Sequence, residues 1–473
     1  MKKYVVIGSS AAGVNGIREL RKYDKDAEIV LISKDKDIYS RCILHEYLAG
    51  KRSLERLRFV EKDFEDLYKV NWKKGVEAVG LDRAAKEVLL DDGSRESYDK
   101  LLIATGSHTF FPPIKNMLGS PNMIGFRNID DIEVLKEVAK TKKNIVVLGS
   151  GLVGIDCATG FLELGVKVVL CDFAGWLLNK QLDPEAAKAY IDAFNARGVE
   201  QHYGVGVNEV QINDKHEITA VVLSDGTVIP CDFFVVTAGV RSNVEFLQDS
   251  GLELSRFGLV YDASGRTNDP DIYGAGDVSG LSPIWPVAGK EGMIAAANMC
   301  GVPEKMTDFF ASKSTMRFLD ISTMSLGNVN PDPEDQTIKV ETYRKGDVYK
   351  KIVHQDGKII GALLQGDLAY GGVLQQMIAR KIDVRKVKKP LFDIDYSDFF
   401  HIRDNDYEFY YDLYHVCHGC VTGTVLLTHL SRHVKEDGPE ARETVLSHGY
   451  GSESRGRFCL THFVMGHRDF LPL

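Results

Sequence analysis

The sequence predicts an α/β fold built on two βαβ units, and three observations indicate it. The first unit opens the chain, where the buried strand KYVVIG, the turn GSSAAG and the helix VNGIRELRKY lead to the strand EIVLIS. The same order recurs at residues 144–172 as NIVVLG, GSGLVG, IDCATGFLELG and KVVLCD. The third observation is the length of 473 residues, which suits about three domains. Two Rossmann-like dinucleotide-binding domains and one further domain would account for the chain.

The second unit carries a complete glycine motif. Its glycines let the backbone approach a pyrophosphate at the start of the helix, and Asp172 ends the following strand. The Asp172 carboxylate would bind a ribose 2′-OH and repel a 2′-phosphate, so we expect NADH rather than NADPH. The NAD-binding positions that we expect are Gly149, Gly151, Leu152, Val153, Gly154, Asp172 and Gly239.

The first unit departs from this motif. Ser10 occupies the position of the middle glycine, and two residues follow the second strand before Asp35 supplies an acid. Either turn alone is also compatible with an ordinary strand-to-helix connection, but the duplication favours nucleotide binding. Two further segments, LLIATGS at 101–107 and TNDPDIYGAGDV at 267–278, are typical of buried strands that end in small-residue turns.

Charge and composition exclude several classes of protein. The 58 basic and 67 acidic side chains leave a formal charge of -9, so we expect no binding to nucleic acid or to anionic membranes. The longest apolar stretch, residues 144–178, contains Asp156, Glu163 and Lys167 and therefore predicts no membrane span. Because no export signal is evident and the eight cysteines are scattered, we expect a cytoplasmic protein.

In combination, the two glycine turns, the ATG of residues 104–106 and the segment DIYGAGD of residues 271–277 resemble the pyridine nucleotide-disulfide oxidoreductase family. The resemblance covers residues 1–411. It implies a glutathione reductase-like fold, with an FAD-binding domain at 1–110 and 241–311 and an NAD(H)-binding domain at 111–240. A C-terminal α+β interface domain at 312–411 would form a homodimer.

The same resemblance implies an FAD site. In the family the aspartate that ends DIYGAGD contacts the flavin ribitol and pyrophosphate, a role that falls to Asp277 here. The helix that begins at Trp285 resembles one whose N-terminus faces the flavin and favours its negative charge. The FAD-binding positions that we expect are Gly8, Ser10, Ala12, Gly13, Asp35, Arg41, Ala104, Thr105, Gly106, Gly276, Asp277 and Ala288.

Within the family, the sequence is similar to the NADH-dependent branch that includes the flavin module of nitrite reductase, rubredoxin and ferredoxin reductases, NADH oxidases and coenzyme A-disulfide reductases. The paired C-x4-C motif is missing, because Cys42 is followed by ILHEYLAG. We therefore expect an FAD-dependent oxidoreductase that passes electrons from NADH to a small redox protein or a nitrite reductase-like centre. The alternatives are a thiol-dependent oxidase, peroxidase or disulfide reductase that uses Cys42, and a flavin-bearing NADH sensor.

A second catalytic candidate is the pair of His45 and Asp156. In ferredoxin reductase-like relatives a lysine and a glutamate at the matching positions meet beside the flavin. If the two shorter side chains also meet here, the carboxylate would raise the pKa of the histidine and make it a proton source. A surface histidine and a helix-start aspartate are the plainer interpretation.

Residues 312–381 predict antiparallel strands with a D-G hairpin turn at Asp356 and Gly357, followed by a helix at 372–381. The last 62 residues, 412–473, differ in character, with seven of the 13 histidines and three of the eight cysteines. CHGC at 417–420 with Cys459 and His462 has zinc-ligand spacing, but no second C-x2-C follows. We therefore predict no metal site and assign this histidine-rich tail no role.

Overall fold

The computed structural model describes residues 1–281, 283–307, 314–385, 387–402 and 409–411. The chain divides into two compact units, Met1–Asp395 and Tyr396–Leu473. The described part of the second unit contains η5 (Tyr396–Phe399) and the antiparallel pair β24 (Phe400–Ile402) and β25 (Phe409–Tyr411). The histidine-rich tail, with CHGC, Cys459 and His462, lies outside the described residues.

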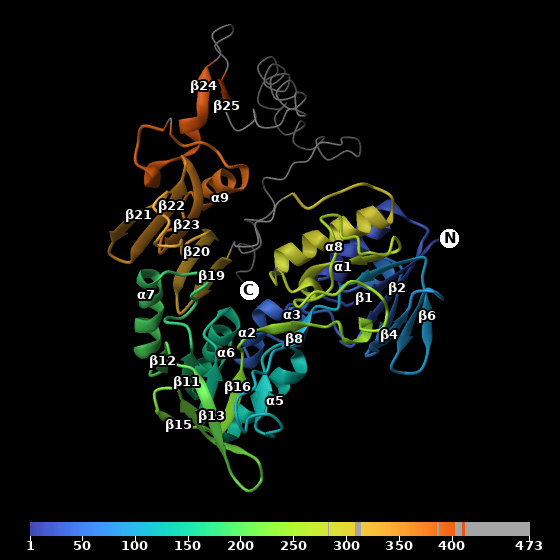
Figure 1. The fold of residues 1–473 in the computed structure, drawn as a ribbon, viewed down its shortest axis with the longest axis horizontal. Coiled ribbons are helices and arrows are strands. Elements are labelled where there is room, and N and C mark those ends of the chain that lie inside the picture. Colours follow the sequence, from blue (N-terminus) through green and yellow to red (C-terminus); the bar gives the residue numbers. More distant parts are fainter. Residues whose placement is uncertain (282, 308–313, 386, 403–408, 412–473) are drawn as a thin grey trace, which may run out of the picture. The chain divides into compact units, whose positions relative to one another are not determined.

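A parallel five-stranded sheet forms around the first βαβ unit. The two strands of the βαβ unit are buried on both faces except at their first residues, which explains the continuous apolar runs in the sequence. The order is β18 (Ile272–Gly274), β7 (Lys100–Ile103), β1 (Lys3–Ile7), β2 (Glu28–Ser33) and β3 (Val70–Lys74). Figure 1 shows α1 (Ala11–Tyr23) and α8 (Trp285–Met299) side by side along this sheet. The other face packs against an antiparallel sheet of β4 (Ala78–Asp82), β5 (Glu87–Leu90) and β6 (Arg95–Ser97).

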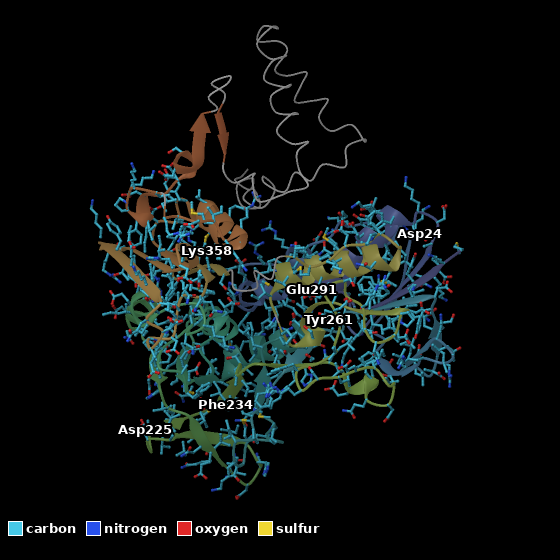
Figure 2. The ribbon with its side chains drawn as sticks, turned by 45° about the horizontal axis from the view of Figure 1, so that its top comes forward. Asp24, Asp225, Phe234, Tyr261, Glu291 and Lys358 are labelled. Atoms are coloured by element: carbon cyan, nitrogen blue, oxygen red, sulfur yellow. The ribbon has the colours of Figure 1, made fainter. Side chains whose placement is uncertain are left out.

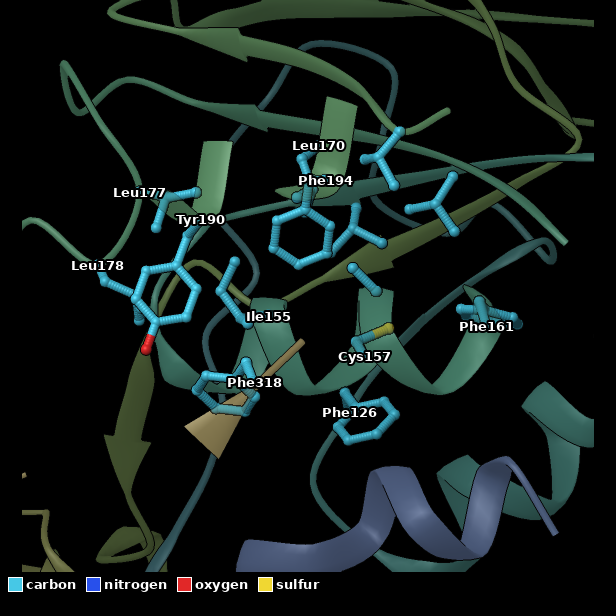
Figure 3. Packing of buried hydrophobic residues seen from close by; sticks show 14 of the residues in the cluster. Phe126, Ile155, Cys157, Phe161, Leu170, Leu177, Leu178, Tyr190, Phe194 and Phe318 are labelled. Carbon is cyan, nitrogen blue, oxygen red and sulfur yellow. The ribbon is translucent and has the colours of Figure 1, made fainter. Parts of the chain in front are cut away.

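A second parallel sheet forms around the second βαβ unit. Its order is β12 (Glu200–Tyr203), β11 (Lys167–Asp172), β10 (Asn144–Leu148), β16 (Phe233–Val236) and β9 (Met123–Gly125). One face packs against α6 (Leu152–Glu163), α5 (Ile129–Thr141) and α7 (Pro184–Asn195). Figure 3 shows this core, in which Ile155 of α6 lies near the rings of Tyr190 and Phe318, and Phe161 of α6 belongs to the same cluster. The opposite face packs against β13 (Val207–Ile212), β14 (Ile218–Leu223) and β15 (Val228–Pro230).

The C-terminal part of the first unit is an antiparallel sheet with one helix. The order is β19 (Ser314–Phe318), β20 (Ile321–Gly327), β23 (Lys358–Gln365), β22 (Val348–Gln355) and β21 (Ile338–Lys345), followed by α9 (Gly371–Arg380). Asp356 and Gly357, with φ of 51° and 74°, form the tight turn between β22 and β23. Positive φ at both positions is what a two-residue hairpin needs, and it explains the D-G signal.

Short elements complete the described chain. They are η1 (Arg41–Ile43), α2 (Leu44–Leu48), α3 (Leu54–Leu57), α4 (Phe64–Leu67), the antiparallel pair β8 (Ser107–Thr109) and β17 (Val240–Ser242), η2 (Glu245–Leu247), η3 (Gly276–Ser279) and η4 (Leu391–Asp393). Within the part of the chain that the structure describes, no helix combines the length and apolar character needed to cross a bilayer. The predicted α/β fold, with two Rossmann-like units and a C-terminal α+β part, is confirmed.

Candidate active site

The first glycine turn brings the start of α1 against the end of β7. A Cβ added to Gly8 would lie 2.1 Å from the carbonyl oxygen of Ala104, and one added to Gly13 would lie 1.8 Å from that of Gly8. The hydroxyl of Ser9 is buried without a protein partner, and Ser10 caps α1 without using its side chain. This turn therefore offers backbone amides and an unused hydroxyl at a helix N-terminus, which fits a pyrophosphate.

The turn lies where α1, α8 and η3 meet. Gly276 has a φ of 82°, and a Cβ there would lie 3.1 Å from Cβ of Ala12 and 3.2 Å from Cβ of Ala288. Glu291, labelled with Tyr261 in Figure 2, accepts hydrogen bonds from the Gly276 amide (2.7 Å) and the Tyr261 hydroxyl (3.0 Å). Small residues thus let α1, α8 and η3 pack closely at this point, and Glu291 fixes the position of η3.

Asp277 follows Gly276 and joins segments that are far apart in the sequence. Its carboxylate accepts hydrogen bonds from Arg127 at 2.7 Å and from the Ser107 hydroxyl at 3.2 Å, and Arg127 also donates to that hydroxyl at 2.7 Å. The ATG turn is held nearby, because Thr105 donates to the carbonyl of Asn243 at 2.8 Å and Gly106 has a φ of 68°. No sequence motif indicates that Arg127 belongs to this site.

A second ion pair involves the two FAD candidates that follow β2. Arg41 donates to Asp35 at 2.7 Å, and the Tyr39 hydroxyl donates to the other oxygen of that carboxylate at 2.9 Å. Arg41 also donates to the side-chain oxygen of Asn128 at 3.2 Å, at the start of α5. Both Asp35 oxygens thus have protein donors, and the pair links the first sheet to α5.

Cys42 lies between Arg41 and α2, in the short helix η1. The residue is exposed as a whole, and neighbouring atoms of the chain partly desolvate its thiol. Burial and then the negative charge of Asp156 raise the pKa of Cys42, and these effects outweigh the opposite influence of Ser40 and Arg127. The arrangement therefore favours a neutral thiol over the thiolate that nucleophilic or redox chemistry needs.

The structure brings His45 and Asp156 together, despite the short reach of both side chains. Nδ1 of His45 lies 3.0 Å from Oδ1 of Asp156, in an ion-pair contact rather than an aligned hydrogen bond. Helices α2 and α6 approach closely at Gly160, where an added Cβ would lie only 2.9 Å from the Leu48 side chain of α2. Burial lowers the pKa of His45, but the Asp156 carboxylate outweighs it, so that pKa is raised; burial also raises the pKa of Asp156. Such a pair can hold a proton near neutral pH.

The second glycine turn has the same construction. A Cβ on Gly149 would lie 2.7 Å from the carbonyl oxygen of Thr237, and one on Gly154 would lie 1.9 Å from that of Gly149. The middle glycine, Gly151, is the N-cap of α6 and has open space around it. Leu152 and Val153 form the first turn of α6, and the amides there are free to meet an anion.

Asp172 ends β11 beside this turn. One carboxylate oxygen accepts hydrogen bonds from the amide (2.6 Å) and hydroxyl (2.8 Å) of Ser150, and the other accepts from the Ala174 amide at 2.9 Å. Gly239 has a φ of 118° and open space beside it. The acid is therefore held rigidly at the carboxyl edge of the sheet, where doubly wound folds bind their ligands.

Comparison with known proteins matches two family models to the chain. The model described as pyridine nucleotide-disulphide oxidoreductase matches residues 2–292, and the one described as rubredoxin NAD+ reductase C-terminal domain matches residues 313–382. Among solved structures, a ferredoxin reductase from Rhodopseudomonas palustris has a TM-score of 0.74 at 24% identity, covering 83% of this chain and 98% of that one. The likeness to this structure shows the fold.

Two relatives have similar sequences. The assimilatory nitrate reductase electron transfer subunit of Bacillus subtilis is 28% identical over 84% of this chain and 52% of its own length. The epsilon subunit of NADH-dependent phenylglyoxylate dehydrogenase from Aromatoleum evansii is 27% identical over 82% of this chain and 93% of its own length. The chain thus spans about half the length of the Bacillus subtilis relative but nearly all of the second one.

Proposed function

Because the chain belongs to the pyridine nucleotide-disulphide oxidoreductase family, whose members are FAD-dependent NAD(P)H oxidoreductases, we propose that it oxidises NADH and passes the electrons to a small redox protein or a nitrite reductase-like centre. Asp172 is the residue that supports NADH, rather than NADPH, as the coenzyme. It stands at the end of β11, and no basic residue occurs from 173 to 179 to bind a 2′-phosphate. The protein acceptor is supported by the relatives, among them an electron transfer subunit and a rubredoxin reductase.

We further propose that the first glycine turn, Asp277 and Arg127 hold FAD. When bound, FAD accepts a hydride from the nicotinamide and releases the electrons to the acceptor. The chain's own contribution would be binding and charge: the amides at the start of α1 and the guanidinium of Arg127 would hold the phosphates, and Asp277 would accept hydrogen bonds from ribitol hydroxyls. His45 and Asp156 would hold a proton close to the reacting atoms.

Two further features of the proposal concern assembly and compartment. Strand β21 is at the edge of the C-terminal sheet and exposes Val340 and Tyr343, which supports a role for this sheet in a homodimer.

The five cysteines within the described residues carry free thiols, which supports a reducing compartment such as the cytoplasm.

The thiol-dependent alternative through Cys42 has weaker support, because the pKa of that thiol is raised. The deciding experiment is an anaerobic titration of the FAD-loaded protein with NADH and NADPH, followed by the flavin absorbance. We expect NADH to reduce the flavin with one electron pair per subunit, both in the natural protein and in Cys42→Ser. A second electron pair that disappears in Cys42→Ser would establish the thiol route instead.

Steady-state turnover with rubredoxin, a [2Fe-2S] ferredoxin, oxygen and coenzyme A disulfide completes the test. Fast turnover with one of the redox proteins is expected. Slow turnover with every acceptor, together with an NADH-driven change in oligomer size, would instead establish the sensor alternative. Equal catalytic efficiency with NADH and NADPH would overturn the role proposed for Asp172.

A further inference from the structure

Phe173, the residue directly after Asp172, is unusually exposed for a phenylalanine. Phe173 exposes 81% of its surface to solvent, more than any other phenylalanine, leucine or valine among the exposed apolar residues of the described chain. A ring in this position contributes nothing to the hydrophobic core. It lies at the carboxyl edge of the second parallel sheet, next to the carboxylate at the second glycine turn.

The loop that carries this ring is firmly anchored. The Ala174 amide donates to Asp172 at 2.9 Å, and the Ala174 carbonyl accepts from the Gly204 amide at 2.8 Å. Further along, the Leu178 amide donates to the carbonyl of Ser150, within the glycine turn, at 2.9 Å. Leu178 has a φ of 53° and is buried in the core cluster shown in Figure 3. A non-glycine residue in this strained conformation indicates that surrounding contacts fix the loop.

Free space adjoins the same loop. A Cβ added to Gly175, Gly204 or Gly206 would meet nothing within 4 Å, so the space beside these three glycines is open to a flat ligand. A dinucleotide whose ribose reaches Asp172 carries its adenine on that same ribose, within reach of the neighbouring side chain. An exposed aromatic ring stacks well on a base, and a preorganised ring loses little entropy on binding.

We propose that Phe173 is a stacking platform for the adenine of the nicotinamide coenzyme, and so a specificity-determining residue. This inference rests on the proposed use of NADH and adds the contact that selects its adenylate half. Asp172 would read the ribose hydroxyls and Phe173 the base, while the glycine turn receives the pyrophosphate.

The test measures binding of ADP-ribose to the FAD-loaded protein by calorimetry, without any turnover. Phe173→Ala should weaken binding about tenfold, or ~1.4 kcal/mol, because one stacking face is lost. Phe173→Tyr retains the ring and should bind like the natural protein. Phe257→Ala, which removes another exposed phenylalanine (47% exposed) outside the second parallel sheet, is the matched control and should change nothing.

Reduced nicotinamide mononucleotide, which lacks the adenylate, provides a second readout. It should reduce the flavin of Phe173→Ala and of the natural protein at the same rate. Equal ADP-ribose affinities of Phe173→Ala and the natural protein would overturn the platform, and so would an equal loss with Phe173→Tyr. If NADH leaves the flavin of the natural protein oxidised, the proposed function fails instead, whatever the ADP-ribose affinities are.

Discussion

At the residue scale, three carboxylates of the candidate flavin site each lie beside a cation. Asp277 faces Arg127, Asp35 faces Arg41, and Asp156 faces His45. Burying a charge is costly unless a partner compensates it, so these pairs let a polar site form between packed elements. His45 is the only cation of the three whose charge changes near neutral pH.

The pair of His45 and Asp156 should make stability depend on pH. Burial lowers the pKa of His45, but the carboxylate outweighs it, so the folded-state pKa lies above its usual value of 6.5. The stabilisation is therefore complete below the unfolded pKa and is lost as pH rises through the folded pKa. Urea unfolding of the natural protein and of His45→Gln should show a larger difference in free energy of unfolding at pH ~6 than at pH ~9.

His202→Gln is the control for this pH dependence. His202 contacts Glu200 at 2.9 Å, but that carboxylate side chain is 45% exposed. Because exposed pairs contribute only about 0–1 kcal/mol, the control should differ little from the natural protein at either pH. A difference for His45→Gln that stays constant from pH ~6 to ~9 would show that His45 is not charged by its partner.

At the scale of elements, glycines set how closely helices approach. Gly292 of α8 faces α1, where an added Cβ would lie 2.1 Å from the backbone carbonyl oxygen of Ala12. Gly160 of α6 likewise faces α2, where an added Cβ would lie 2.9 Å from the Leu48 side chain. The first of these contacts adjoins the proposed flavin site, because Ala12 also lies against Gly276, the residue before Asp277.

Gly292→Ala should therefore separate α1 from α8 and disturb the flavin site. Overpacking of this kind costs about 1–3 kcal/mol, more than the ~1 kcal/mol that alanine adds to a helix. We expect urea unfolding to show a net loss of about 1 kcal/mol and the purified protein to retain less FAD.

Gly289→Ala, one turn earlier on α8, is the matched control for this substitution. Its Cβ would meet only the side-chain amide of Asn15, at 3.1 Å. The side chain can move, so this variant should be as stable as the natural protein or slightly more so. Gly289→Ala destabilising the protein as much as Gly292→Ala would contradict the close-approach argument.

The separation along the sequence between contacting residues explains which parts of the candidate site the sequence could predict. Gly13 and Gly154 lie against the carbonyl oxygens of Gly8 and Gly149, each pair within one strand-turn-helix unit, so the spacing of these glycines alone indicates the turns. Arg127 was missed because its partner Asp277 lies 150 residues away, and no periodicity encodes such a pair. The only local signal is an arginine directly before the Asn128 capping box of α5.

At the scale of the whole first unit, a buried polar cluster joins the second parallel sheet's helices to the C-terminal sheet. Asp183 caps α7 by accepting from the Ala186 amide at 2.9 Å. The same side chain accepts from the Tyr349 hydroxyl at 2.7 Å and from Lys351 at 3.0 Å, both on β22. Asp183 and Lys351 are 6% and 8% exposed, so little water compensates either charge.

Breaking this cluster should destabilise the protein strongly. Lys351→Met leaves the Asp183 charge buried without its cation, which costs about 3 kcal/mol in urea unfolding. Adding Asp183→Asn removes that charge but keeps the oxygen that caps α7, so the double variant should regain part of the loss. The matched control is Lys350→Met, the neighbouring residue on β22, whose partner Asp367 is 45% exposed; it should cost at most ~1 kcal/mol. Equal losses for the two lysine variants would show that the buried pair does not hold the C-terminal sheet to α7.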